Sequence, residues 1–354
     1  MKIALITDTH FGARNDNLAF NDYFYKFWEE VYFPYIEANG IDTVIHLGDV
    51  MDRRKFVSYK IAKDFRERFL QKFVDLGVTV HMMVGNHDTF YKNTNEVNSL
   101  DELINGKFPN IHTYPATTTV DFDGTPICFI PWICPENHAE TMQHIQETKA
   151  QVAMGHLEIN GFEMHAGVKS ENGYDKGFLK KFDTVFSGHF HKKSDDGQVY
   201  YLGTTYQMTW ADNNCPKGFH IFDTDTRELE RIVNPYSIFE KVYYDDSVKD
   251  FSDFNVLTLK DKYVRIVVVN KKDIYQFDRF VDKVLSESGA HEVKIVEDFS
   301  ELDASNVSDE IVENAEDTMT VLERYIDELD VELDKNRLTS MMKSLYLEAS
   351  DLEL

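Results

Sequence analysis

Five short apolar runs organise the sequence, and each ends abruptly in residues that can bind a metal ion. The runs are KIALIT, TVIHL, VTVHMMV, QVAM and TVFS, and the polar stretches are Asp8-Thr9-His10, Gly48-Asp49, Gly85-Asn86-His87-Asp88, Gly155-His156 and Gly188-His189-Phe190-His191. An apolar run of this length between turn residues predicts a buried strand. In open α/β sheets, sites form at the carboxyl ends of strands. We therefore expect these polar ends to lie along one edge of a sheet and to form the active site there.

Helical patterns alternate with the first three runs. Apolar residues recur at helical spacing over residues 18–38, before Asn39-Gly40, and over residues 58–76, before Gly77. The second stretch carries an apolar stripe of Ile61, Phe65, Phe69 and Phe73. A third helix is expected over residues 95–104. This alternation of strand and helix indicates βαβ units.

Short strands and turns follow from about residue 113. Asp123-Gly124 is typical of a hairpin turn, and residues 137–149 have a helical pattern. VYYLGT, GFHIFDTD and ELERIVN look like consecutive antiparallel strands. We therefore expect residues 1–235 to form one α/β domain, with mixed sheets inside and helices outside.

The rest of the chain divides into three parts. Residues 236–298 contain a strand (263–269), a helix (273–287) and a strand (293–296), which predicts a small α/β domain that caps the first. Residues 299–316 are acidic and poor in apolar side chains, as in a flexible linker. Residues 317–354 predict two short amphipathic helices. Their apolar stripes are Leu322, Tyr325, Ile326, Leu329 and Leu333, then Leu338, Met341, Met342 and Leu345.

The charge of the chain is negative and uneven. The formal charge is −25, of which the 18 acidic and 4 basic residues from 297 to 354 contribute −14, leaving −11 for the rest. A free-standing nucleic-acid-binding protein usually has a basic surface, so a bound metal or a basic partner fits better. Cys128, Cys134 and Cys215 lack metal-binding spacing and are expected to be buried, reduced thiols of a cytosolic protein. No apolar stretch approaches the length of a membrane span.

The five polar stretches supply three Asp, one Asn and five His. This mixture of carboxylate, amide and imidazole suits Mn²⁺ or Fe²⁺, with Zn²⁺ possible. One carboxylate can bridge two ions about 4 Å apart, as two-metal phosphoryl-transfer sites require. Phosphate-binding glycine loops and nucleophilic-serine motifs are absent from the sequence.

The order Asp-x-His, Gly-Asp, Gly-Asn-His-Asp, Gly-His and Gly-His-x-His resembles the calcineurin-like metallophosphoesterase superfamily. Within it, the chain resembles the SbcD-type DNA nucleases, which include phage recombination endonuclease subunits. The resemblance covers residues 1–235 well and the later parts in outline. It implies two mixed β-sheets flanked by helices. It also implies a metal-dependent DNA exo- or endonuclease of recombination, repair and DNA-end processing, in the cytoplasm (the host's, if phage-encoded).

The resemblance assigns a role to each motif residue. One metal ion would be held by Asp8, His10, Asp49 and His191, and the other by Asp49, Asn86, His156 and His189. His87 would act as an acid or stabilise developing charge, and Asp88 would orient it. Manganese is the expected metal, with Fe, Mg or Zn as alternatives.

Other polar residues near the motifs have less specific interpretations. His46 and His81 lie inside apolar runs and are expected to pack in the core. Asp52-Arg53 also resembles the serine/threonine protein phosphatases, but Arg54 and the Gly-Asn-His-Asp motif favour the nucleases. Candidates for contacts to DNA phosphates are Arg14, Arg53, Arg54, Lys55, Lys92, Lys192 and Lys193.

Three functions are compatible with these motifs: a DNA nuclease with an ATPase partner, a small-substrate phosphatase or cyclic-nucleotide phosphodiesterase, and a non-catalytic scaffold. The complete set of motif residues disfavours the scaffold, and the tethered helices disfavour the small-substrate enzyme. Residues 317–354 are expected to bind the coiled-coil base of an SbcC-type ATPase. A homodimer is expected through residues 58–76 and 95–104, because the phenylalanine stripe exceeds what one sheet face should bury.

Overall fold

The structure is a computed structural model that describes residues 1–165, 168–170 and 173–296. The chain forms two compact units. The larger comprises Met1–Glu240, Val256–Val264 and Leu285–Glu292, and the described residues of the smaller are 241–255, 265–284 and 293–296. Among the described residues, the helices are too short or too polar to cross a membrane.

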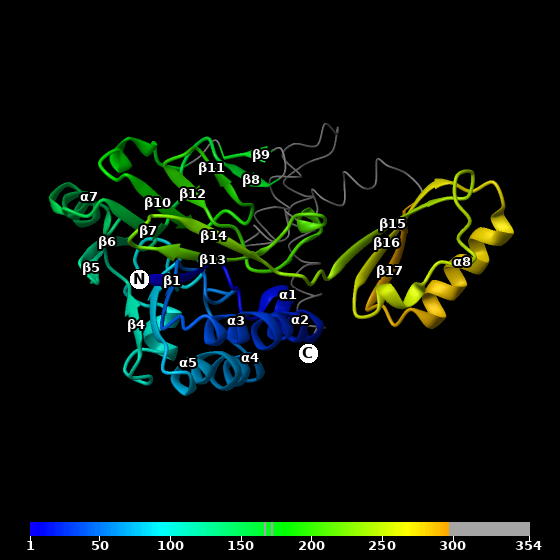
Figure 1. The fold of residues 1–354 in the computed structure, drawn as a ribbon, viewed down its shortest axis with the longest axis horizontal. Coiled ribbons are helices and arrows are strands. Elements are labelled where there is room, and N and C mark those ends of the chain that lie inside the picture. The colour runs from blue at the N-terminus through cyan, green and yellow to red at the C-terminus, as the bar shows by residue number, and fades with distance from the viewer. Residues whose placement is uncertain (166–167, 171–172, 297–354) are drawn as a thin grey trace, which may run out of the picture. The chain divides into compact units, whose positions relative to one another are not determined.

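Six strands form the first sheet of the larger unit (Figure 1). In spatial order they are β14 (Leu229–Val233), β13 (Gly218–Asp223), β1 (Lys2–Ile6), β2 (Thr43–His46), β3 (Thr79–Met83) and β4 (Ile111–Tyr114). β1 to β4 are parallel, which confirms the predicted βαβ units. β13 pairs antiparallel with both β1 and β14.

Six further strands form the second sheet. In spatial order they are β11 (Ser194–Asp195), β12 (Val199–Tyr201), β10 (Thr184–Gly188), β7 (Val152–His156), β6 (Thr125–Ile130) and β5 (Thr118–Phe122). β5 and β6 form the predicted hairpin, and Asp123 and Gly124 at its turn both have positive φ. A separate short pair, β8 (Glu163–His165) and β9 (Val168–Lys169), follows β7.

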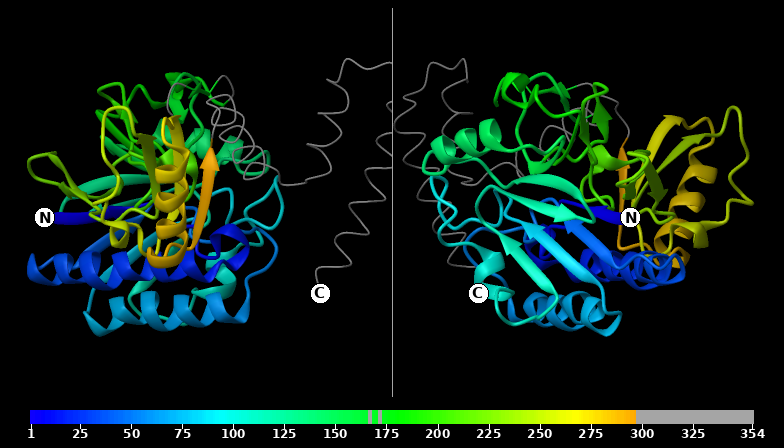
Figure 2. Two further views of the ribbon diagram at one scale, coloured as in Figure 1. Left: turned by 90° about the vertical axis from the view of Figure 1, so that its right-hand side faces the viewer. Right: turned by 60° about the vertical axis from the view of Figure 1, so that its left-hand side comes forward.

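The two sheets pack face to face. Side chains from both form one buried cluster, which includes Ile3, Leu5, Ile45, Phe129, Val152 and Phe186. The alternate residues of β1, Ala4 and Ile6, pack against helices on the opposite face. Ile145 of α7 (His138–Glu147) covers the outer face of the second sheet. The result is a helix–sheet–sheet–helix sandwich, as predicted (Figure 2).

Two long helical stretches cover the first sheet, and each contains a π-helical segment. α2 (Leu18–Phe27) continues through Trp28–Tyr32 into α3 (Phe33–Ala38). α4 (Tyr59–Asp64) continues through Phe65–Leu70 into α5 (Gln71–Asp75). The shorter elements are α1 (Ala13–Asp16), α6 (Ser99–Leu103) and 3₁₀ turns at Lys176–Leu179, Trp210–Asp212 and Val256–Leu259.

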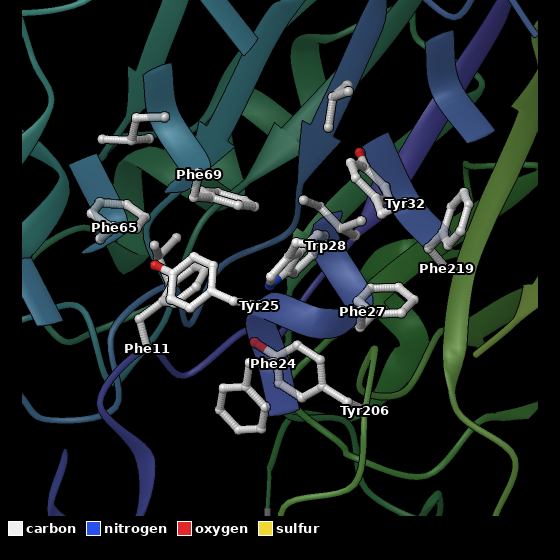
Figure 3. Close-up of a cluster of buried hydrophobic side chains, with 14 of the residues drawn as sticks. Phe11, Phe24, Tyr25, Phe27, Trp28, Tyr32, Phe65, Phe69, Tyr206 and Phe219 are labelled. Carbon is white, nitrogen blue, oxygen red and sulfur yellow. The ribbon is translucent and has the colours of Figure 1, made fainter. Parts of the chain in front are cut away.

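The helices and the first sheet enclose a core of aromatic rings (Figure 3). Phe65, Phe69 and Phe73 are at most 1% exposed, and the Phe69 ring lies 4.8 Å from that of Trp28. The prediction that this stripe exceeds the needs of the core was therefore wrong. These rings offer no surface to a second copy of the chain.

Four other expectations also need correction. The five motif-bearing strands divide between two sheets, so they do not share one sheet edge. VYYLGT contributes β12 of the second sheet and does not pair with β13. Helix α6 begins only at Ser99, where the side chain of Asn98 caps it by accepting the Asp101 N–H. Cys215 is only partly buried.

The smaller unit is built on a three-stranded sheet in the order β15 (Phe239–Asp245), β16 (Tyr263–Asn270) and β17 (Glu292–Val296). Its helix α8 (Ile274–Glu287) buries Phe277 and Phe280, whose rings contact that of Tyr244. β16, α8 and β17 match the expected elements, whereas β15 was not predicted. The expected linker (299–316) and helical pair (317–354) lie outside the described residues.

Buried histidines should make the larger unit sensitive to acid, and His220 on β13 offers a test. Burial, with the positive charges of Arg231 and Lys193, lowers the pKa of His220 to about 3. An unfolded histidine has a pKa of about 6.5, so the unfolded chain binds more protons between these values and stability falls as pH falls below about 6.5. Urea titrations at pH 7.5 and pH 5.0 give the unfolding free energy of each protein at both pH values. We expect its decrease from pH 7.5 to pH 5.0 to be about 2 kcal/mol smaller for His220→Gln than for the wild type. Equal losses would contradict this.

Candidate metal centre

The sharp ends of β1, β2, β3, β7 and β10 bring the motif side chains together. Asp8, His10, Asp49 and His189 all have positive φ, between 42° and 86°. Such backbone is rare for residues other than glycine and tends to occur at functional sites. Close packing adds a second constraint, because a Cβ at Gly85 would lie 2.2 Å from the backbone nitrogen of Asp49. Gly85 thus lets the loop after β3 approach Asp49.

Asp8, His10 and His191 form one group whose potential ligand atoms all lie within 4.8 Å of one another. His10 Nε2 lies 4.0 Å from Asp8 Oδ1 and 3.7 Å from Asp49 Oδ2. Both ring nitrogens of His10 are buried, and Nε2 has no hydrogen-bond partner within the described part of the chain. Buried polar atoms are normally hydrogen-bonded, so this imidazole nitrogen fits the role of a metal ligand.

Asp49, His156 and His189 form a second group of the same compactness. His156 donates from Nδ1 to the Leu47 carbonyl at 2.9 Å, so Nε2 carries the lone pair when the ring is neutral. That Nε2 lies 3.3 Å from Asp49 Oδ2 and 2.9 Å from Asn86 Oδ1. Asn86 Oδ1 is also 2.9 Å from His189 Nδ1. Asp49 Oδ2 therefore lies close to histidines of both groups.

The electrostatics of the site favour added positive charge. Burial alone would lower the pKa values of His10 and His156, but neighbouring carboxylates outweigh it and raise both to about 9. Burial and the nearby Asp49 raise the pKa of Asp8. Burial opposes ionisation of Asp49 too, but His156 and His87 hold its pKa well below the usual range. Without other cations, protons on histidines balance the buried carboxylates, and divalent ions would replace those protons.

The donor set fits two divalent ions. It combines carboxylate, imidazole and amide oxygen, without thiolates, which suits borderline or hard ions. Each imidazole would need an unprotonated nitrogen, and the Leu47 contact already fixes such a tautomer for His156. Among the described residues, Asp8, His10 and His191 lie together and so do Asp49, His156 and His189, and Asp49 also lies close to His10.

His87 lies beside the two groups. Its Nδ1 donates to the Asp52 carbonyl at 2.6 Å, because a carbonyl can only accept. Its Nε2 is then the nitrogen available to substrate. The His10 and His87 rings lie 4.8 Å apart, and the Asp52 carboxylate approaches His10 Nδ1 at 3.3 Å. His10, Asp52 and His87 form a third compact group of potential ligands. The sequence singled out Asp52 only for its resemblance to protein phosphatases, and its place beside His10 and His87 was not predicted.

Asp88 has a different task from the expected one. Its carboxylate accepts hydrogen bonds from the backbone N–H groups of Gly85, Val50 and Met51 and from the Ser99 hydroxyl. These hydrogen bonds join the loop after β2, the loop after β3 and the start of α6, while the Nδ1 of His87 donates to the Asp52 carbonyl. Trp132, also missed, lies with its ring 5.3 Å from that of His189.

This geometry predicts the effect of Asp88→Asn. An amide cannot accept as many backbone hydrogen bonds, so the loop that carries Asp49 should loosen. We expect metal affinity to fall about 10- to 100-fold, as is common when the supporting shell of a metal site is altered. Titration of the metal-free variant with Mn²⁺ measures this. A variant with wild-type affinity and a lower kcat would instead support a role for Asp88 in orienting His87.

The candidate phosphate-binding residues are mostly engaged within the chain. Arg53 pairs with Asp16 and stacks on Phe56, and Arg14 donates to the Met208 carbonyl at 3.1 Å. Lys192 pairs with Glu163, and Lys193 with Asp195. Lys55 and Lys92 have exposed side chains, and Arg54 is largely sheltered. The expected histidines of the core are indeed packed: His46 bonds Thr9, and His81 bonds Tyr114.

Comparisons with known proteins indicate the family of the chain. Residues 1–193 match the calcineurin-like phosphoesterase family. Exonuclease subunit 1 of Enterobacteria phage T4 is 36% identical over 355 residues, which cover 99% of this chain and 100% of that protein. Similar solved structures include an archaeal phosphodiesterase (17% identical, 66% of this chain and 100% of that one, TM-score 0.32). Another is GAP50, the anchor in the inner membrane complex of Plasmodium, which is 12% identical with a TM-score of 0.39. The match covers 67% of this chain and 90% of that one. The chain therefore belongs to the calcineurin-like phosphoesterase family and is a hydrolase of phosphoester bonds.

Proposed function

We propose that this protein is a metal-dependent DNA nuclease and the nuclease subunit of an SbcCD-like complex in recombination, repair and DNA-end processing. The observation that carries the proposal is the pair of ligand groups on either side of Asp49. The full-length similarity to a phage exonuclease subunit supports DNA as substrate.

In this proposal the ligands follow the two groups. Asp8, His10, Asp49 and His191 hold one ion, and Asp49, Asn86, His156 and His189 hold the other. Manganese is the proposed metal, because carboxylate, amide and imidazole ligands together suit it. When bound, two such ions lower the pKa of the attacking water and neutralise charge on the phosphoryl oxygens.

The chain's own groups complete the reaction. Asp49 accepts the backbone N–H of His87 at 2.8 Å, so a hydrogen bond links the proposed bridging carboxylate to the loop that carries His87. His87 keeps its Nδ1 proton on the Asp52 carbonyl and can present an Nε2 proton to the leaving oxygen or to the charge on the phosphate. Lys55 and Lys92, whose side chains are exposed, are proposed to contact DNA phosphates. The same role is proposed for Arg14, Arg53, Arg54, Lys192 and Lys193, whose contacts within the chain would be replaced by contacts to phosphate when DNA binds.

One assay tests the substrate class. Purified protein with Mn²⁺ should release nucleotides from linear duplex DNA, with metal-free protein and EDTA as controls. p-Nitrophenyl phosphate and cyclic nucleotides are assayed in parallel. Hydrolysis of these small substrates with intact DNA would instead favour a small-substrate phosphatase or phosphodiesterase.

We also propose that residues 317–354 bind the coiled-coil base of an SbcC-type ATPase. Their sequence carries two apolar stripes, and the phage relative is itself named a subunit. Short amphipathic helices gain stability by laying an apolar face in a partner's groove.

Deletion of residues 317–354 is expected to abolish co-purification with the ATPase while the chain keeps its own Mn²⁺-dependent nuclease activity. Residues 1–316 therefore serve as the variant and the full chain as the control, each co-expressed with the ATPase. A truncated chain that still co-purifies, or that loses its own activity, would contradict the docking role.

A homodimer through the α4–α5 and α6 region remains a proposal, although its aromatic premise failed. A shallow surface hollow lies there, lined by apolar residues such as Leu70 and Leu103 and by charged residues such as Arg66 and Lys107. Light scattering at micromolar concentration tests it, and a monomer with and without DNA would remove it.

A further inference from the structure

A buried ion pair lies behind the metal-ligand candidate His191. Lys217 Nζ is 2.5 Å from Asp212 Oδ1, and the two side chains are 2% and 8% exposed. Lys217 Nζ also donates to the backbone carbonyl of His191 at 2.8 Å. A buried ion pair adds little stability as a rule, because desolvation offsets its attraction. Its contact with His191 suggests a positioning role.

The same carbonyl has a second donor. The Thr204 N–H donates to His191 O at 3.1 Å. Gly203 lies against this contact, since a Cβ there would stand 2.9 Å from His191 O. The far side of the pair is fixed as well: Asp212 Oδ2 accepts the N–H groups of Met208 and Thr209. The backbone of His191 is therefore held from several directions.

The segment 204–217, which we call the clasp, also holds the loop after β1. Tyr206 is fully buried, and its ring stacks on Phe24 at 3.7 Å. Its hydroxyl donates to the Thr9 carbonyl at 2.5 Å, between Asp8 and His10 in the chain. The clasp thus anchors both loops that supply Asp8, His10 and His191. In the other group, His156 is held by the Leu47 carbonyl instead.

We propose that the clasp sets the affinity of one metal position, that of Asp8, His10 and His191, with Lys217 and Tyr206 as positioning residues. The inference rests on the metal assignment of the proposed function. Loss of a clasp contact lets a ligand loop relax, and changes in the supporting shell of a metal site commonly cost 10- to 100-fold in affinity.

The test is calorimetric titration of the metal-free full chain with Mn²⁺. Lys217→Met/Asp212→Asn removes both charges together, so that no unpaired buried charge remains, and Tyr206→Phe removes one hydroxyl. Each should weaken one of two sites by about 10- to 100-fold and leave the other unchanged. Two further substitutions identify the weakened site. In the charge-pair variant, His191→Ala should hardly change the affinity of the site that was unaffected, because His191 belongs to the other position. His189→Ala should weaken that unaffected site, because His189 belongs to it.

Asp64→Asn is the control for general destabilisation. Asp64 is a buried carboxylate on α4 that binds Asn21 and Lys60, so its loss should lower stability without selective loss of one metal. If the charge-pair variant fails to fold, Tyr206→Phe decides. Equal weakening of both sites, or no weakening, would overturn this inference alone. A wild type that binds no divalent ion would overturn the proposed function with it.

Discussion

Asp49→Ala is expected to abolish phosphodiester hydrolysis and to disturb both metal positions. Asp49 Oδ2 lies 3.7 Å from His10 Nε2 and 3.3 Å from His156 Nε2, so one carboxylate serves both groups. Its Oδ1 also receives the His87 N–H. Without both ions, the transition state loses several kcal/mol of charge stabilisation, which corresponds to a fall in rate of at least about 10³-fold.

Elemental analysis after dialysis against Mn²⁺, together with the nuclease assay, measures both effects. Asp42→Ala is the matched control, because it removes an exposed carboxylate just before the same strand, β2. The control should keep two ions and full activity. Near-normal activity of Asp49→Ala, or loss of one ion only, would refute the bridging role.

His87→Ala is expected to keep both ions and to lose most of the catalytic rate. His87 is oriented by the Asp52 carbonyl and lies beside the two ligand groups rather than within them. A group that donates a proton or stabilises developing charge contributes about 10²- to 10⁴-fold to rate. Values of kcat and metal content are measured together, with His112→Ala, an exposed histidine, as control. If the variant lost an ion, His87 would be a ligand in the group with His10 and Asp52.

The strands and the motif loops could be predicted because their signals are local. An apolar run that stops at Gly, Asp or His fixes a strand and its end, and all five such runs form strands. The division of these strands between two sheets depends on pairing between distant segments, as between β1 and β13. Periodicity carries no information about that pairing.

Side-chain partners were harder to predict for the same reason. Asp88 follows His87 in sequence, yet its carboxylate faces the backbone at Val50 and Met51. The burial of Phe65, Phe69 and Phe73 depends on facing rings such as those of Phe11 and Trp28, and helical periodicity does not show which residues will face a stripe. No sequence pattern singles out Lys217, because its role depends on a hydrogen bond to the His191 carbonyl, 26 positions away in the chain.

The claim that two metal ions share Asp49 can be tested most directly with crystals grown in Mn²⁺ and measured at the manganese absorption edge. The account predicts two anomalous peaks about 3.5–4 Å apart, with the Asp49 carboxylate in contact with both. His191 should lie beside one peak and His189 beside the other. A single peak, or a peak held by His10, Asp52 and His87, would contradict it.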